Sequence, residues 1–83
     1  MEHIFLGEVS NNEYILKQVK QIPTQSIMKK QQIQSLSDYL AKAVHHDEHH
    51  IITINDQLPI RLTNDEANQL ITELESIEQS LIE

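Results

Sequence analysis

The stretch 51-IITINDQLPIRL-62, in the second half of the sequence, decides the fold. Ile52 and Ile54 alternate with Thr53, which is the period of a β-strand. The three apolar residues after residue 57 alternate in the same way with Pro59 and Arg61. Asn55-Asp56 suits a tight turn, so we predict a β-hairpin. Pro59 has no N–H to donate to a ladder, so the returning strand should have at least one free edge.

The residues after this hairpin carry the signals of a helix start. Thr63 and Glu66 have the spacing of a capping box, in which the hydroxyl and the carboxylate each accept a backbone N–H of the other residue. Leu62 and Ala67 take the staple positions, and Asp65 suits the positive end of the helix dipole. We predict that an amphipathic helix fills the rest of the sequence. Its apolar face consists of Ala67, Leu70, Ile71, Leu74, Ile77 and Leu81.

A second amphipathic helix is predicted from Lys29 to Val44. Its apolar face consists of Ile33, Leu36, Leu40, Ala43 and Val44. Pro23 is expected to end the preceding element, and residues 24–26 offer candidate N-cap side chains. The helix is expected to end in the polar segment 45–50.

The first 22 residues allow two interpretations. Residues 3–9 suit a strand and residues 10–13 suit a turn, so residues 14–19 can form the return strand of a first hairpin. Residues 10–22 also fit a helix, because Ser10 and Glu13 have capping-box spacing. We favour the hairpin, since the residues directly after the turn are β-prone.

These elements predict an α+β fold in the order ββαββα. Two β-hairpins form a small antiparallel sheet, and two amphipathic helices pack on one of its faces. We expect residues 1–83 to form a single domain with a thin core. Self-association is one remedy for a thin core, so a homodimer and a monomer both stay open. The apolar end at Leu81-Ile82 and the edge formed by Phe5 and Tyr14 are candidate dimer surfaces.

Composition limits the classes of function. The sequence has no cysteine, which rules out disulfides and thiolate metal sites, and its single glycine, Gly7, argues against phosphate-binding loops. We see no catalytic residues, no cofactor motif, no leader and no segment apolar enough to span a membrane, so we expect a cytoplasmic protein that is not an enzyme. Isoleucine outnumbers valine and asparagine and glutamine are frequent, which favours an AT-rich bacterial or phage genome.

The net charge of −7 is unevenly distributed. Residues 1–44 carry five lysines and four carboxylates, which nets +1, whereas residues 45–83 carry one arginine and nine carboxylates, which nets −8. Such a balance disfavours attraction to nucleic acid and to anionic membranes. A basic protein partner, including a nucleic-acid-binding protein, is compatible with it.

The acidic face of the last helix is therefore the candidate partner-binding surface. Its carboxylates are Asp65, Glu66, Glu73, Glu75 and Glu78, and we expect the last three to point mostly away from the apolar face. They could imitate the spacing of phosphates, as in an inhibitor of the DNA-mimic type. The simpler interpretation is an ordinary solvated helix face.

The histidine cluster is the competing candidate. His45 with His49, and His46 with His50, have the i, i+4 spacing that can hold zinc, nickel or copper on a helix. The strand expected from about Ile51 breaks that geometry, so a solvated connection is the simpler interpretation. Clustered imidazoles beside carboxylates could also respond to pH.

A DNA-binding alternative requires residues 10–22 to be helical, which would give an arrangement vaguely like a winged helix. Its recognition helix would carry Gln31, Gln32 and Gln34 but no arginine, so direct nucleic-acid binding is disfavoured. We therefore predict a non-enzymatic protein–protein interaction or regulatory module. A metal- or pH-responsive protein is the alternative.

Overall fold

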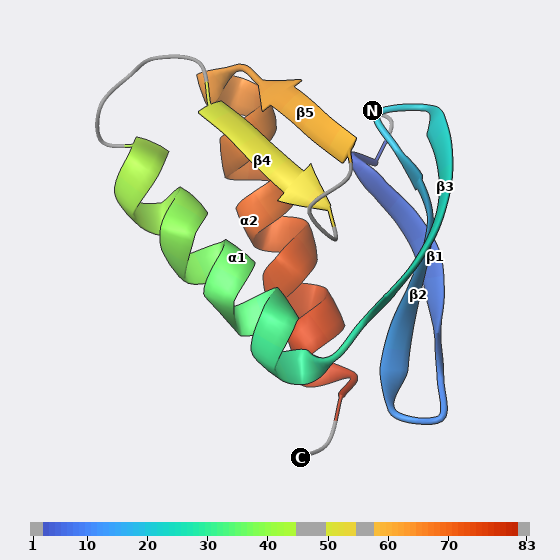
Figure 1. Cartoon of the computed structure of the whole chain (residues 1–83). Helices are drawn as coiled ribbons and strands as arrows, with labels where there is room; N and C mark the ends of the chain where they lie inside the picture. Colours follow the sequence, from blue (N-terminus) through green and yellow to red (C-terminus); the bar gives the residue numbers. More distant parts are fainter. Residues whose placement is uncertain (1–2, 45–49, 55–57, 82–83) are drawn as a thin grey trace.

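The computed structural model describes residues 3–44, 50–54 and 58–81, and contains five strands and two helices within them (Figure 1). In chain order they are β1 (Phe5–Ser10), β2 (Glu13–Val19), β3 (Ile22–Met28), α1 (Lys30–Ala43), β4 (His50–Ile54), β5 (Leu58–Leu62) and α2 (Asn64–Gln79).

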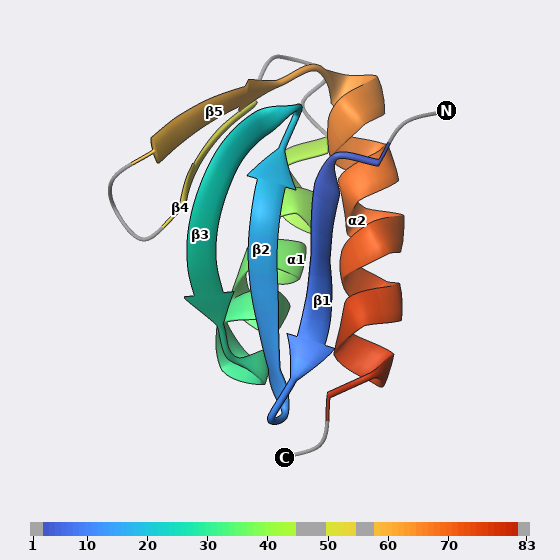
Figure 2. The ribbon, with the colours of Figure 1, turned by 90° about the vertical axis from the view of Figure 1, so that its right-hand side faces the viewer.

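The strands form two antiparallel sheets, one ordered β1-β2-β3 and the other made of β4 and β5. The two helices lie side by side against one face of the three-stranded sheet, and its opposite face is covered by no described helix or strand (Figure 2). The β4–β5 hairpin lies near the end of α1 and the start of α2 (Figure 1). The α+β class and the helices packed on one sheet face agree with the sequence prediction.

The predicted order ββαββα is also confirmed, with one strand added before α1. Residues 24–26, expected to offer the N-cap of the helix, lie in β3 instead. Pro23 is compatible with this strand because β3 is an edge, where a missing N–H costs little. The N-cap of α1 is Lys29, whose N–H donates to Gln32 Oε1 at 2.8 Å.

Residues 13–19, for which the sequence allowed either a helix or a strand, form strand β2 of the first hairpin. Asn11 and Asn12 have φ values of 53° and 61°, which asparagine tolerates well. The β2–β3 turn also uses the left-handed region, with φ of 49° at Lys20 and 70° at Gln21. These residue types are unusual there, so the sequence contains no clear signal for this turn.

Alternation along the three-stranded sheet separates a buried from an exposed face. Tyr14 and Leu16 of β2 point to the helices, and a register shift between Leu16 and Gln18 returns Val19 to the same side. One core unites this sheet with the helices and the second hairpin. Its most buried large side chains are Leu16, Val19, Ile33, Leu40, Leu62, Leu70 and Leu74.

The helix start predicted at Thr63 is confirmed. Thr63 N donates to Glu66 Oε1 at 2.9 Å, and Glu66 N donates to Thr63 Oγ1 at 3.2 Å. Leu62 and Ala67, on either side of the box, are both fully buried. Neither α1 nor α2, the helices of the described part of the chain, combines the length and apolarity needed to cross a membrane.

The described side chains of the expected dimer surfaces are buried, and Ile82 lies outside the described residues. Phe5, Tyr14 and Leu81 are 4%, 5% and 3% exposed and belong to the core. The apolar side chains that remain exposed lie elsewhere. The large ones are Leu6, Val9, Ile22, Ile27, Tyr39 and Ile51.

Gly7 has no room for a side chain, which gives a direct test of β1 packing. A Cβ there would overlap the carbonyl oxygen of Ile15 and lie 2.9 Å from Cζ of Tyr14. We expect Gly7→Ala to lower the free energy of unfolding by about 3 kcal/mol, as overpacking against backbone does. Urea denaturation measures this. Glu8→Ala, on the same strand but exposed, should cost about 0.5 kcal/mol, and equal losses would contradict the packing.

Candidate functional site

The five carboxylates predicted to bind a partner have different environments in the structure. Glu66, Glu73 and Glu78 are partly buried and hydrogen-bonded within the chain. Asp65 and Glu75 are exposed. The acidic face is therefore divided between groups that hold the fold together and groups that point to solvent.

Glu73 links the last helix to the first strand. Its Oε2 accepts the N–H of Ile4 and its Oε1 accepts the N–H of Phe5, both at 2.9 Å. Oε2 also accepts Nε2 of Gln69 at 3.0 Å and lies 3.5 Å from Nδ1 of His3. The side chain is only 11% exposed, so its charge is used inside the fold.

The expectation that Glu73 points away from the apolar face is wrong. Glu73 follows Leu70 by three residues and precedes Ile77 by four, so it lies at the margin of the buried stripe. A carboxylate at that margin reaches the start of β1, where it accepts two successive backbone N–H groups. This spacing can be read from the sequence, but the position of β1 relative to α2 cannot.

Glu66 and Glu78 also have partners within the chain. Lys20 Nζ donates to Glu66 Oε1 at 3.1 Å and to the carbonyl oxygen of Arg61 at 2.9 Å. The N–H of Thr63, and then Lys20, hold the pKa of Glu66 below its ordinary value of 4.5. Its stabilising effect is present above that pH and is lost as the pH falls through the lowered value. Gln34 Nε2 of α1 donates to Glu78 Oε1 at 3.0 Å.

The outward stripe of α2 is polar and acidic. Asp65 and Glu75 are exposed on it, and α2 contains no lysine or arginine at any position. Ten residues separate the two carboxylates, which places them about 15 Å apart along the helix axis. The exposed residues of this stripe are Asp65, Asn68, Thr72, Glu75 and Gln79.

A hollow of about 270 Å³ lies between β1 and α2, beside Glu73. Its lining is mostly apolar, with Phe5 and Tyr14 stacked at a ring-centroid distance of 6.4 Å. Burial, helped by the charge of Glu73, raises the pKa of Tyr14 to about 12. Tyr14 therefore stays protonated near neutral pH. The Glu73 carboxylate already accepts several donors, so the hollow presents no free acid–base pair.

The histidine candidates are only partly within the described residues. His45, His46 and His49 lie outside them. His50 begins β4, is 5% exposed, and has Nε2 3.1 Å from Oδ1 of Asn64. Over residues 3–44, 50–54 and 58–81, no group of three or more histidine, cysteine, aspartate or glutamate side chains could hold a metal ion.

Comparisons with protein-family models, with curated proteins and with solved structures found no match to this chain. The site is therefore interpreted from its own residues.

Removal of the Glu73 carboxylate should destabilise the protein. Glu73→Ala leaves the N–H groups of Ile4 and Phe5 without their acceptor, and we expect a loss of about 3 kcal/mol in the free energy of unfolding. Glu75→Ala, on the same helix but exposed, should change it by less than about 0.5 kcal/mol. Urea denaturation of both variants measures the difference. Similar small losses would show that Glu73 does not anchor β1.

The Tyr14 environment can be tested by spectroscopic titration. In a Tyr39→Phe variant, Tyr14 is the remaining tyrosine, and the absorbance of tyrosinate should rise with a midpoint near pH 12 in the folded protein. In urea, the midpoint should return to about 10. The protonated form is favoured by folding, so the stability that it contributes is present below pH 10 and is lost toward pH 12. A folded-state midpoint near 10 would place the hydroxyl in water.

Proposed function

We propose that this protein is a non-enzymatic interaction module that binds a basic protein partner through the outward stripe of α2. The observation that supports this most directly is the exposure of Asp65 and Glu75 on a helix that carries no basic residue. Two carboxylates about 15 Å apart can contact separate basic side chains of a partner.

Three of the five carboxylates are bonded within the chain, so fewer of them are available to contact a partner directly. Glu66 and Glu73 bind groups of the same chain, so they supply negative potential without being free to pair with a partner. Glu78 accepts a hydrogen bond from the side chain of Gln34. A partner would therefore meet the potential of five carboxylates but form its direct contacts with Asp65 and Glu75.

The competing functions have less support. The metal- or pH-responsive alternative depends on residues 45–49, which are outside the described residues, and His50 is buried against Asn64. The winged-helix alternative required a helix over residues 10–22, whereas residues 13–19 form β2. The basic-partner proposal is therefore the one that we pursue.

Neutralisation of the two exposed carboxylates tests this proposal. The double variant Asp65→Asn/Glu75→Gln should bind a partner captured with the wild-type protein about two- to thirtyfold more weakly, since each surface ion pair contributes about 0.2–1 kcal/mol. Titration calorimetry at two salt concentrations measures the loss, and the salt dependence should become weaker.

The control removes the same amount of charge elsewhere. Glu13→Gln/Asp38→Asn changes two carboxylates on β2 and α1 and should leave the affinity unchanged. If both double variants bind as tightly as the wild type, the outward stripe of α2 is not the contact surface. Equal weakening of both would indicate a response to net charge alone.

A further inference from the structure

The uncovered face of the three-stranded sheet carries an apolar patch. We define the outer sheet patch as Leu6, Glu8, Ile15, Lys17 and Ile27. In β2 and β3 these residues alternate with buried ones, whereas in β1 only Phe5 is buried and the next four residues are all exposed. Leu6 is 43% exposed and Ile27 is 55% exposed. A solvated sheet face is usually polar, so three large apolar side chains in this small area require a reason.

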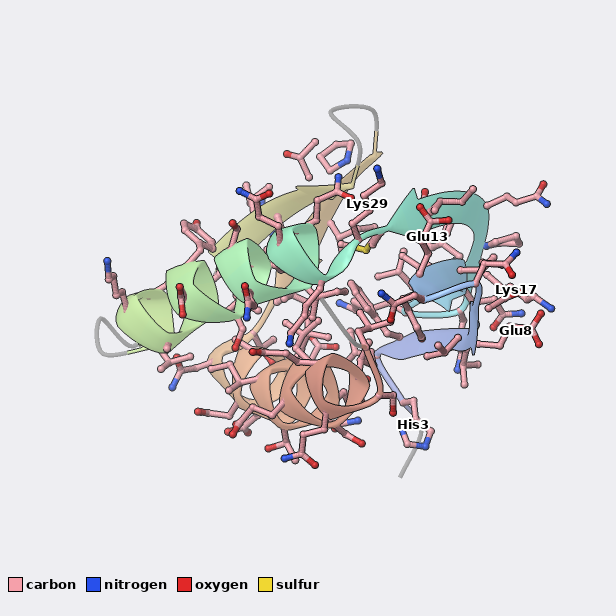
Figure 3. All side chains as sticks on the ribbon, turned by 90° about the horizontal axis from the view of Figure 1, so that it is seen from below. His3, Glu8, Glu13, Lys17 and Lys29 are labelled. Atoms are coloured by element: carbon pink, nitrogen blue, oxygen red, sulfur yellow. The ribbon has the colours of Figure 1, made fainter. Side chains whose placement is uncertain are left out.

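The register brings these side chains together. Ile15 is the ladder partner of both Glu8 and Ile27, so one row of the patch crosses all three strands. Lys17 Nζ lies 3.3 Å from Glu8 Oε1, and the two side chains lie together on the side of the sheet away from the helices (Figure 3). Both are about 60% exposed, so this ion pair is open to other partners.

We propose that the outer sheet patch binds a second copy of this chain, sheet face against sheet face, about a two-fold axis. A two-fold interface uses the same patch on both copies, so the patch must complement itself. The outer sheet patch does so, because it has an apolar centre and one charge of each sign. Glu8 of one copy can pair with Lys17 of the other.

Charge distinguishes a second copy from other occupants. Each chain carries −7 overall, so two copies repel unless they meet through a region of low charge. The charges of the outer sheet patch sum to zero, with Glu8 at −1 and Lys17 at +1. A basic partner is attracted more strongly to α2, and anionic lipid or nucleic acid is repelled by the whole molecule.

The size of the face sets the expected affinity. Three strands about 5 Å apart and about 20 Å long present a face of about 15 × 20 Å. Two such faces bury about 600 Å² in total, which is below the roughly 1,000 Å² of a stable interface, so we expect a weak, reversible dimer with a dissociation constant on the order of 100 µM. The measured mass should therefore rise with concentration from 9.6 kDa toward twice that value.

Sedimentation equilibrium between about 10 µM and 1 mM tests the proposal. Ile27→Lys places an unpaired charge in the apolar part of the interface and should weaken dimerisation at least tenfold. The matched control is Ile51→Lys on the outer face of β4, because Ile51 is 56% exposed, almost the same as Ile27. This control should dimerise like the wild type. Circular dichroism verifies that both variants are folded.

A charge exchange tests the pairing itself. Glu8→Lys makes the charged part of the patch wholly basic, and Lys17→Glu makes it wholly acidic, so each variant alone should be monomeric. An equimolar mixture restores opposite charges across the interface and should form a mixed dimer. Recovery in the mixture cannot result from loss of folding in either variant.

Several outcomes would overturn the proposal. A wild-type mass of 9.6 kDa at 1 mM excludes the dimer, and equal effects of Ile27→Lys and Ile51→Lys exclude this patch. If the wild type is monomeric and Ile27→Lys weakens binding of a captured basic partner, the patch belongs to that partner. Asp65→Asn/Glu75→Gln should leave dimerisation unchanged, so failure here is distinct from failure of the proposed function.

Discussion

The carboxylate of Glu73 is the polar contact on which the arrangement of the two halves most depends. Among the residues that the structure describes, no backbone ladder joins the three-stranded sheet to the β4–β5 sheet, so apolar packing and side-chain bonds hold them together. Glu73 fixes the start of β1 on α2, and Lys20 fixes the β2–β3 turn to Arg61 and Glu66. Both contacts join groups more than 40 residues apart in the sequence.

Because some carboxylates of α2 are bonded within the fold, the acidic composition of this helix does not by itself indicate a binding surface. A helix with five carboxylates suggests a uniform binding face, yet Glu66 and Glu73 act as acceptors for N–H groups of the chain. The remaining outward stripe lies on α2, whereas the outer sheet patch lies on the opposite side of the three-stranded sheet from the helices (Figure 2). The two surfaces can therefore be occupied at the same time.

Local signals predicted most elements, and long-range geometry explains what they missed. The capping box at Thr63 and the apolar stripe of α1 depend only on neighbouring residues, so both were readable in the sequence. β3 was missed because Pro23 suggests an end, whereas an edge strand accommodates it. The role of Glu73 depends on where β1 lies, and a pattern along one helix does not contain that information.

The β2–β3 turn has a consequence for how the chain folds. Lys20 and Gln21 adopt left-handed backbone conformations that cost about 1–2 kcal/mol each, so the turn is a poor starting point for its own hairpin. The contacts of Lys20 with Arg61 and Glu66 offset that cost only once residues 58–66 are in place. β3 is thus expected to form late, once the second half of the chain is in place.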